Sequence, residues 1–528
     1  MKMLLGIKTD SFSLTILLGL SFFSIWICIL AFFIPLTFYV ELVLLVISLI
    51  PYCSKKLRVY MVSFPKVLLK SVWFWIFCII IILAGTYYPF IPDHFYYYKP
   101  TLNWLNQYGL ITGVANIKWS FGQMSVYHMI QAGLDQTIDL FQRINVFFSI
   151  LFLIYIFERK AFLLLFIIPI YFLFIQTSSP DVAIIYISLI IVNEVFFNYK
   201  ADNYKILFII SVFTFTIKPV TFWLPIWIFI AGYFLNKKEL KDYRIYLFPI
   251  LFIVLFLIKN VIASSTLLYP ISFTKLNTYW LTDLRFLELS GENASVLTFH
   301  KFFTKDVINT MSFFHKIYYW LSIKEFRTII NWIIILTVTS FGIFSFIKKN
   351  PVYLSLWIII FIKIIVTFMF SGQFRFLLDG VYPLLFIMFH HIRISKTKTI
   401  VAGFLFSILL LALISFPPFL KRSIPSLQLT EWMKGFSKET LLFPGKYNEK
   451  KYSKDKIGNL EFYISAYVFT YDTPPPAFIY YRLNQLYNLG VFPQMKDPNN
   501  IRKGYYMKML EPEEKERLGE IIKKYFPD

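Results

Sequence analysis

The sequence is poor in charged residues, and this scarcity excludes most soluble folds. Asp, Glu, Lys and Arg make up 16% of the 528 residues, whereas a soluble globular domain carries about 25%. Hydrophobic residues make up 58%, and the mean hydropathy is +0.63. Apolar runs recur that are about twenty residues long, the length that a helix needs to cross a bilayer. The composition therefore predicts an integral membrane protein.

Other absences narrow the class. The apolar runs lack the period-two alternation of membrane-barrel strands, so we expect helices. The three cysteines, Cys28, Cys53 and Cys78, lie in or beside apolar runs. They predict neither a disulfide framework nor a metal site, and no His pair has metal-site spacing. The run 12–33 is long for a signal-peptide core and lacks a clear cleavage site, so we expect a retained helix.

Acidic residues are scarcer than basic ones, with 30 Asp and Glu against 52 Lys and Arg, for a net charge of +22. No basic segment resembles a known nucleic-acid-binding module, so nucleic acid is not an expected partner. Lys and Arg instead hold cytoplasmic loops of membrane proteins in place. We therefore assign the positive charge to those loops.

We expect about thirteen membrane-spanning helices. The segments that meet at Lys218 and Pro219, and those that flank Glu158 to Lys160, include short spans that suit tilted or re-entrant helices. The predicted spans are residues 12–33, 36–52, 68–90, 143–157, 161–176, 182–198, 206–218, 220–235, 245–262, 326–347, 352–370, 376–392 and 399–416.

If these spans alternate in direction, the basic loop residues fall on one side of the membrane, which the positive-inside rule assigns to the cytoplasm. The short connections on the other side are almost uncharged. The basic residues are Lys55, Lys56, Arg58, Lys66, Lys70, Arg159, Lys160, Lys200, Lys205, Lys237, Lys238, Lys241, Arg244, Lys348, Lys349, Arg393, Lys396 and Lys398.

This topology places three long segments outside, at residues 91–142, 263–325 and from 418 onward. We therefore expect a transmembrane domain over 1–417 and a small extracytoplasmic α+β domain over 418–528. Within the tail, aromatic and β-branched residues predict a strand over 461–471. Residues 512–526 predict a helix, because a proline and two Glu begin the segment and two Lys end it.

Five charged residues stand out because ionisable groups at membrane depth are costly and usually functional. Asp93 follows span three, Asp181 begins span six, Lys218 ends span seven, and Arg375 and Asp379 lie at the start of span twelve. On this topology all lie near the outer face. Lys and Arg bind phosphate, and a carboxylate can act as base toward a hydroxyl, so the set suits a sugar linked to a phosphate.

Each of these residues also has a structural interpretation. Asp93 follows Pro92 and suits a turn or a helix cap, and Ser178 to Asp181 suit the capped start of a helix. Lys218 suits a side chain that snorkels to the interface, and Arg375 suits an interfacial anchor. The sequence alone leaves both interpretations open.

Within the first outer segment, the stretch from Asp93 to Leu134 is dense in aromatic residues, which favours the membrane interface and the faces of sugars. Trp104 and Tyr108 predict an amphipathic helix that ends at Gly109, followed by a loop and a second short helix. An interfacial helix pair without a ligand is the alternative.

This segment resembles the GT-C superfamily of polytopic glycosyltransferases, which includes the protein mannosyltransferases and aminoarabinose transferases. More narrowly, it is similar to uncharacterised bacterial membrane proteins with D-x-x-x-Y-H followed by W-x-x-x-Y-G-x-x-x-G-x-A-N. Those proteins also carry a later Ser-Pro-Asp, matched by Ser179-Pro180-Asp181, and a Lys near an outer helix end, matched by Lys218. The residues that match the first segment are Asp93, Tyr97, Trp104, Tyr108, Gly109, Gly113, Ala115 and Asn116, with Tyr98 in place of the His.

The resemblance implies an all-α polytopic enzyme of the bacterial inner membrane that serves cell-envelope polysaccharide biosynthesis. Its active site would face outside and transfer a sugar from a polyprenyl-phosphate donor to a glycan, lipid or protein acceptor. Asp93 would be catalytic, and the expected substrate-binding residues are Lys218, Arg375, Asp181, Tyr97, Trp104 and Asn116. The superfamily often has paired acids in this loop, whereas Asp93 stands alone and Asp135 and Asp139 are distant. We predict no metal ligands, and a need for Mg²⁺ or Mn²⁺ stays open.

Two other functions stay open. A polysaccharide polymerase or ligase of the O-antigen type also has many spans and outer-facing arginines, and would use the long segment 263–325. A transporter or flippase is the non-enzymatic alternative. Transporters tend to carry internal repeats and sites at the membrane midplane, whereas this sequence shows no repeat and its polar residues gather near one face.

Overall fold

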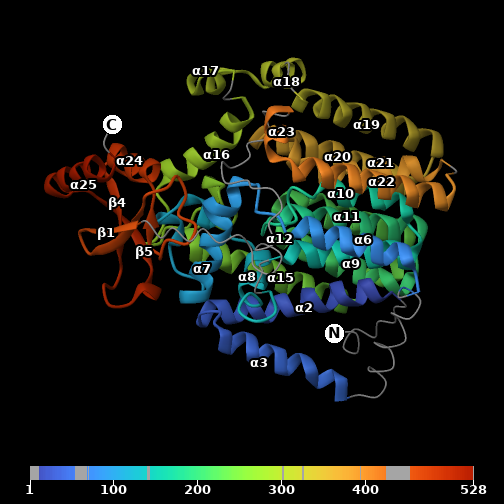
Figure 1. Ribbon diagram of the computed structural model, residues 1–528, viewed down its shortest axis with the longest axis horizontal. Coiled ribbons are helices and arrows are strands. Elements are labelled where there is room, and N and C mark those ends of the chain that lie inside the picture. Colours follow the sequence, from blue (N-terminus) through green and yellow to red (C-terminus); the bar gives the residue numbers. More distant parts are fainter. Residues whose placement is uncertain are drawn as a thin grey trace.

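The computed structural model describes residues 11–53, 68, 70–139, 143–299, 302–323, 326–392, 394–423 and 452–526. A bundle of apolar helices fills one side of the molecule, and a small region of strands and helices from the C-terminus lies at the other (Figure 1). Six helices of the described chain are long and apolar enough to cross a membrane, and four shorter ones are also apolar. The expectation of a helical membrane protein with a small C-terminal sheet region is confirmed.

Most predicted spans coincide with one helix each, within a few residues. The six long helices are α2 (Phe12–Phe33), α11 (Pro180–Phe197), α15 (Arg244–Ser264), α19 (Phe326–Lys348), α20 (Pro351–Phe370) and α22 (Lys396–Ser415). The shorter helices at predicted spans are α3 (Phe38–Leu49), α6 (Val72–Gly85), α9 (Ile144–Arg159), α12 (Tyr204–Ile217), α13 (Trp223–Leu235) and α21 (Leu378–His390).

The predicted span over residues 161–176 is wrong as a single helix. The segment forms a 3₁₀ helix, η5 (Phe162–Phe166), one α-turn, α10 (Ile167–Ile170), and then a series of turns. Pro169 has no N–H to donate to a helical ladder. Beyond it, Tyr171 donates its N–H to Ile168 O and Phe174 donates to Tyr171 O; each bond spans three residues, as in a 3₁₀ turn, rather than the four of an α-helix.

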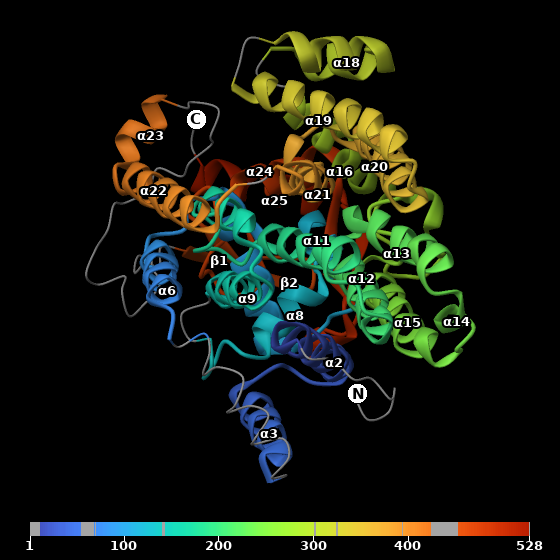
Figure 2. The same cartoon turned by 90° about the vertical axis from the view of Figure 1, so that its right-hand side faces the viewer.

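Helix α11 lies at the centre of the bundle and is buried on almost every side (Figure 2). A helix that is apolar all round suits such a core position. In contrast, α19, α20 and α22 expose large apolar side chains, among them Trp332, Phe361 and Leu405. Continuous exposed apolar faces of this kind suit contact with lipid.

The start of α11 is capped as the sequence predicted. The Ser179 Oγ accepts the Asp181 N–H at 3.3 Å, Pro180 occupies the first turn, and the Asp181 carboxylate lies near the positive end of the helix dipole. This capped start fixes where the Asp181 side chain stands.

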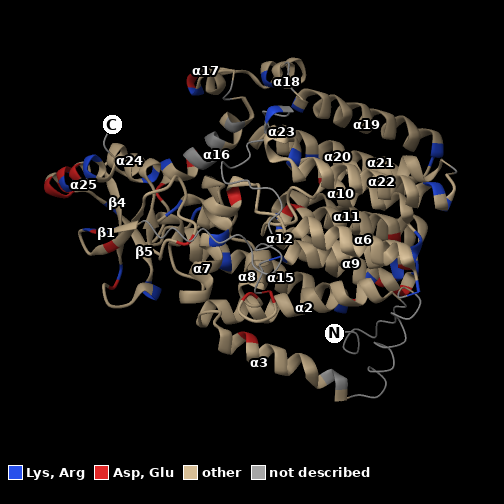
Figure 3. Ribbon diagram, viewed as in Figure 1, with Lys and Arg blue, Asp and Glu red and all other residues tan. Residues whose placement is uncertain are grey.

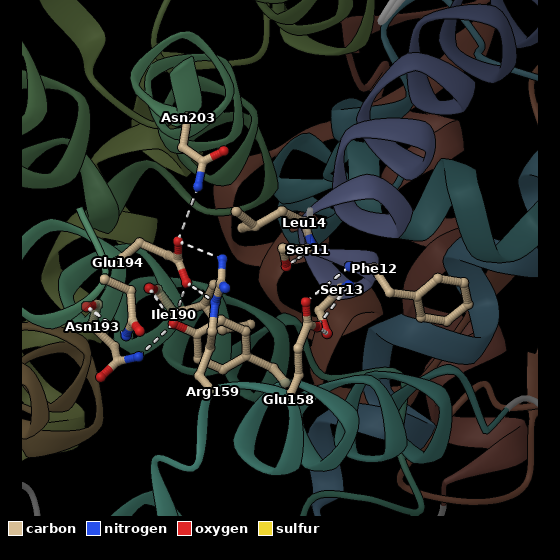
Figure 4. Close-up of polar contacts among 12 residues, drawn as sticks. Ser11, Phe12, Ser13, Leu14, Glu158, Arg159, Ile190, Asn193, Glu194 and Asn203 are labelled. Carbon is tan, nitrogen blue, oxygen red and sulfur yellow. Dashed lines mark hydrogen bonds and ion pairs between the residues drawn. The ribbon is translucent and has the colours of Figure 1, made fainter. Parts of the chain in front are cut away.

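A second polar network joins three helices of the bundle (Figure 4). The Glu194 carboxylate of α11 accepts the Arg159 Nε at 2.7 Å, the Tyr155 hydroxyl at 3.0 Å and the Asn203 Nδ2 at 3.3 Å. Beside it, Glu158 accepts the N–H of Phe12 at 2.9 Å, which ties the start of α2 to the end of α9. These buried polar groups are thus bound to one another, as stability requires.

The first outer segment has the helices that the sequence predicted. Helix α7 (Lys99–Tyr108) ends at Gly109, whose φ of +74° favours glycine. A loop follows and leads to α8 (Val126–Ala132). The buried Glu41 of α3 accepts the N–H groups of residues 136–138 at 2.7–2.8 Å, which anchors the end of this segment.

The second outer segment, predicted over 263–325, is largely helical. It contains α16 (Leu284–Phe299), α17 (Lys305–Thr310) and α18 (Phe313–Ser322). The Trp320 Nε1 of α18 donates to Gly372 O at 2.7 Å, and the Ser371 Oγ donates to Ala294 O of α16 at 3.1 Å. The segment therefore holds the loop that leads to Arg375.

The C-terminal region has two small sheets. Strands β1 (Tyr452–Ile457) and β2 (Leu460–Ser465) pair antiparallel, and β3 (Ala477–Phe478) adds in parallel; β4 (Val491–Met495) pairs antiparallel with β5 (Tyr505–Met509). Two helices, α24 (Tyr480–Leu489) and α25 (Pro512–Tyr525), complete it. The helix predicted over 512–526 is confirmed as α25.

The strand predicted over 461–471 is too long, because β2 ends at Ser465. The Ser465 Oγ accepts the Tyr467 N–H and donates to Phe469 O, which turns the chain away from the sheet. The predicted domain boundary at 417/418 falls at the start of α23 (Pro417–Ser423). Residues 424–451 of the predicted tail, and Lys55, Lys56, Arg58, Lys66 and Arg393 of the orientation argument, lie outside the described residues.

The C-terminal region packs on the first outer segment through polar contacts. The Arg482 guanidinium of α24 donates to Ile117 O at 3.0 Å and Asn116 O at 2.9 Å, and the Tyr505 N–H of β5 donates to Thr112 O at 2.9 Å. The Arg482 side chain also lies 3.9 Å from the ring centroid of Phe286. The tail thus helps to hold the segment that begins at Asp93.

We predict that Arg159→Met destabilises the fold, because it leaves the Glu194 carboxylate, which is 1% exposed, without its cation. Breaking a buried pair in this way costs about 3–5 kcal/mol. Thermal unfolding in detergent should show a clearly lower melting temperature. Glu194→Gln in the same chain should recover part of the loss, and the exposed Arg517→Met should change little; equal melting temperatures for all variants would contradict the prediction.

Candidate functional site

Alternating helix directions bring four charged residues to one place. Asp181 stands at the start of α11, and Lys218 directly follows the end of α12. Arg375 lies in the 3₁₀ turn η9 (Phe374–Phe376) before α21, and Asp93 lies between α6 and the π-helical turn η2 (His94–Tyr98). We call these four residues the four-charge cluster. All four were predicted as site residues.

The cluster consists of two ion pairs of different exposure. The Arg375 NH1 donates to the Asp93 Oδ2 at 3.0 Å, and the two side chains are 32% and 28% exposed. The Lys218 Nζ donates to the Asp181 Oδ1, and here the carboxylate is only 4% exposed. The side chains of Asp93 and Arg375 are therefore partly exposed at the protein surface, whereas the Asp181 carboxylate is enclosed by the protein.

The two pairs share the ring of Phe376. The Lys218 Nζ lies 4.6 Å from its centroid, and the Arg375 Cζ lies 4.9 Å from it. Cations over an aromatic face are attracted by its quadrupole. Burial lowers the pKa of Arg375, but the Asp93 and Asp181 charges raise it by more, so that it lies above its ordinary value. The guanidinium is therefore permanently charged.

A third ion pair supports the helix that follows Arg375. Lys363 of α20 pairs with Asp379 in the first turn of α21, and both side chains are fully buried. The Trp223 Nε1 donates to the second carboxylate oxygen of Asp379 at 2.8 Å. Because Asp379 is four residues after Arg375, these contacts fix the start of α21 and thereby the place of Arg375.

Aromatic residues of η2 border the cluster. The Tyr98 hydroxyl donates to the Ser179 Oγ at 3.5 Å, and the Tyr97 and Tyr98 ring centroids are 4.3 Å apart. Burial raises the pKa of both phenols, and the Asp93 charge raises them further. Both therefore stay protonated and able to donate. Tyr97 thus lies near the charged residues.

Trp104 and Asn116, also predicted to bind substrate, make other contacts. Trp104 is 2% exposed and packs on Tyr108, Phe121 and Tyr505. The Asn116 Nδ2 donates to Trp280 O at 3.1 Å and to Tyr505 O at 3.3 Å. These side chains join the outer segments to the tail, and the structure does not bring them into the four-charge cluster.

Three further residues near the cluster, Lys363, His128 and Lys118, were not predicted from the sequence. Lys363 lies inside an apolar run, where a lone charge is itself a signal that we did not use. His128 stacks on Tyr98, with ring centroids 5.2 Å apart. Lys118 is 3% exposed and donates from Nζ to Tyr96 O at 2.5 Å. Nothing in the local sequence marks the last two as neighbours of Asp93.

Within the described ranges, no group of three or more His, Cys, Asp or Glu side chains is placed to hold a metal ion. The carboxylates of the cluster, Asp93 and Asp181, are each paired with a cation. Of the distant acids of the outer segment, Asp135 accepts the Asn106 Nδ2 at 3.0 Å and Asp139 accepts the Arg143 N–H at 2.7 Å. The structure gives both a local structural role.

We predict a pH-dependent stability from Asp139. Burial, aided by the Asp135 charge and opposed by the Arg143 N–H, raises the pKa of Asp139 to about 7. The pKa of Asp139 in the folded state lies above its value in the unfolded state, which is about 3.9. The protonated carboxyl therefore stabilises the fold at low pH, and this stabilisation is lost as the pH rises through 7. Melting temperatures at pH 4.5 and 7.5 should therefore show wild type losing stability relative to Asp139→Asn. The same difference at both pH values would contradict this.

No curated protein and no solved structure matches the chain. One family profile matches residues 1–382, a range that contains all four residues of the cluster as well as Lys363 and Asp379, and that ends within α21. This match covers well over half of the chain. The chain therefore belongs to the family described as a domain of unknown function, DUF8201.

Proposed function

We propose that this protein is a membrane glycosyltransferase that moves a sugar from a polyprenyl-phosphate donor to a glycan, lipid or protein acceptor. The observation that carries the proposal is the partly exposed Asp93–Arg375 pair beside the enclosed Asp181–Lys218 pair. One pair is accessible to a substrate, and the other holds its surroundings in place.

Arg375 is suited to bind the donor phosphate. A guanidinium carries five N–H donors, and Arg375 uses one of them on Asp93, while its buried Nε has no hydrogen-bond partner among the described residues. Arg–phosphate contacts are often bidentate and stronger than neutral hydrogen bonds. A phosphate would therefore compete well for this side chain.

Asp93 is suited to act as base once the phosphate engages Arg375. The acceptor hydroxyl oxygen attacks the anomeric carbon while Asp93 takes its proton. The bond between that carbon and the phosphate oxygen breaks, and its electron pair goes to the phosphate oxygen. Arg375, and Lys218 behind it, stabilise the negative charge that grows there. Attack opposite the leaving phosphate inverts the anomeric configuration.

Asp181 has a different part in this proposal. Its carboxylate is enclosed, and it accepts from Lys218 and lies 3.3 Å from the Ser179 Oγ. A carboxylate so well paired is a poor base, but it fixes the Lys218 ammonium at the edge of the cluster. We therefore assign Asp181 to positioning, and Asp93 to the proton transfer.

The positive-inside rule supports an outward-facing site. Figure 3 shows Lys and Arg at the end of the bundle away from the C-terminal region. Lys205 lies in the first turn of α12, whose other end leads to Lys218, and Lys348 ends α19 just before α20, whose other end leads to Arg375. This end is opposite the four-charge cluster, and an excess of basic loop residues is typical of the cytoplasmic side. We infer about thirteen crossings, one of them made by the irregular segment 161–176, with the cluster on the extracytoplasmic face of the bacterial inner membrane.

The test is the mass profile of cell-surface glycans in a deletion strain that is complemented with wild type, Asp93→Asn or Asp306→Asn. Loss of a general base lowers rates by about 10²–10⁴-fold. We expect wild type and the exposed control Asp306→Asn to restore one missing sugar, and Asp93→Asn to fail although it reaches the membrane in equal amount.

Other outcomes point to the alternatives. A change from long chains to single repeats in the deletion strain would favour a polysaccharide polymerase or ligase. Unchanged glycans in every strain would remove the transferase proposal and favour a transporter or flippase. Full restoration by Asp93→Asn would exclude Asp93 as the base, while the proposal that the protein is a transferase would stand.

A further inference from the structure

His128 occupies the third position of α8 and closes a capping box with Ser125. The Ser125 backbone N–H donates to the His128 Nδ1 at 3.2 Å, and the Ser125 side chain accepts the N–H of His128. A backbone N–H can only donate, so Nδ1 must accept and carries no proton. In a neutral imidazole the proton then resides on Nε2.

The imidazole is neutral over the whole physiological range. Its side chain is 1% exposed. Burial, together with the positive charges of Lys259 and Lys218, lowers the pKa of His128 to about 3. The Nε2–H is thus a fixed hydrogen-bond donor, because the capping box sets both the ring orientation and the tautomer.

This donor has no hydrogen-bond partner in the described part of the chain. A buried donor left without an acceptor is costly, and such groups are rare in folded proteins. Across its ring face, His128 stacks on Tyr98 at 5.2 Å and 29°. Tyr98 in turn contacts Ser179, the cap residue next to Asp181. The unpaired donor is therefore one aromatic ring away from the four-charge cluster.

The surroundings select an anionic acceptor for this donor. Lys259 of α15 is 2% exposed, and its Nζ donates to Met124 O at 2.5 Å rather than to a carboxylate. The Lys218 charge also acts on His128. The Lys218 ammonium and the neutral N–H donor of His128 together favour an oxygen with negative charge.

We propose that His128 is a further binding residue of this site, and that its Nε2–H donates a hydrogen bond to an oxygen of the lipid-linked phosphate. The inference rests on the proposed function and names a residue that recognises the donor. Arg375 would bind the phosphate with its permanent charge, while His128 adds a neutral, directional contact whose orientation α8 fixes.

Two substitutions separate this role from the capping role. In His128→Gln, the side-chain oxygen can accept the Ser125 N–H, as Gln does in capping boxes, while its amide N–H reaches as far as Nε2. In His128→Asn, the oxygen stands near the place of Nδ1 and keeps the cap, but the amide N–H is too short to reach the phosphate. Both variants should therefore fold, which melting temperatures in detergent will check.

The experiment measures binding of farnesyl phosphate to the purified full-length chain in detergent by titration calorimetry, with farnesol as the uncharged control. We expect wild type and His128→Gln to prefer farnesyl phosphate over farnesol. His128→Asn should lose about tenfold in affinity for farnesyl phosphate, with unchanged farnesol binding. Equal affinities of His128→Asn and wild type for farnesyl phosphate, or no binding of it by wild type, would overturn the proposal.

The binding assay is independent of sugar transfer, so the two proposals fail separately. If His128→Asn loses phosphate binding while surface glycans do not depend on the protein, His128 keeps its role and the transferase proposal falls. If glycans depend on Asp93 but phosphate binding does not depend on His128, the transferase remains and the role of His128 is overturned. A loss that follows the melting temperature in both variants, with farnesol affinity reduced equally, would assign His128 to the cap alone.

Discussion

A charge that lies among apolar helices needs an opposite charge or strong hydrogen bonds, because its desolvation is otherwise too costly. In this protein the pairs Lys363–Asp379, Arg159–Glu194 and Lys218–Asp181 meet that constraint, and each pair joins two helices. They thereby set which helices are neighbours and how the helix ends align. The position of Arg375 beside Asp93 follows from this alignment, since Arg375 precedes Asp379 by four residues. Lys218 and Arg375 also contact the same ring, that of Phe376.

The features that could be predicted from the sequence are those that depend on a few neighbouring residues. Long apolar runs gave α2 its bounds, and Ser179 with Pro180 marked the start of α11, because caps and hydrophobic length act within a few residues. The four charged residues were found for a related reason. Each lies at the end of an apolar run, and alternation of the spans places all of these ends on one side, where the structure brings them into contact.

The features that could not be predicted depend on contacts between segments that are distant in the sequence, and no local sequence pattern indicates such contacts. Pro169 interrupts the segment 161–176, yet its apolar composition resembles that of a span. Trp104 and Asn116 looked like ligands of a sugar, but they pack against β5 and the loop at Trp280, far along the chain. Likewise, nothing in the sequence near His128 shows that its ring stacks on Tyr98, thirty residues earlier.

The contacts between the tail and the first outer segment span most of the chain. Arg482 donates to residues 116 and 117 across 366 and 365 positions, and Asn116 contacts Tyr505 across 389. Contacts of such long sequence separation form late in folding. During synthesis, the segment that begins at Asp93 therefore leaves the ribosome long before the residues that fasten it. The contacts that fasten this segment form only after α24 and β5 have reached the same side of the membrane, so they are among the last to form in the biogenesis of this protein.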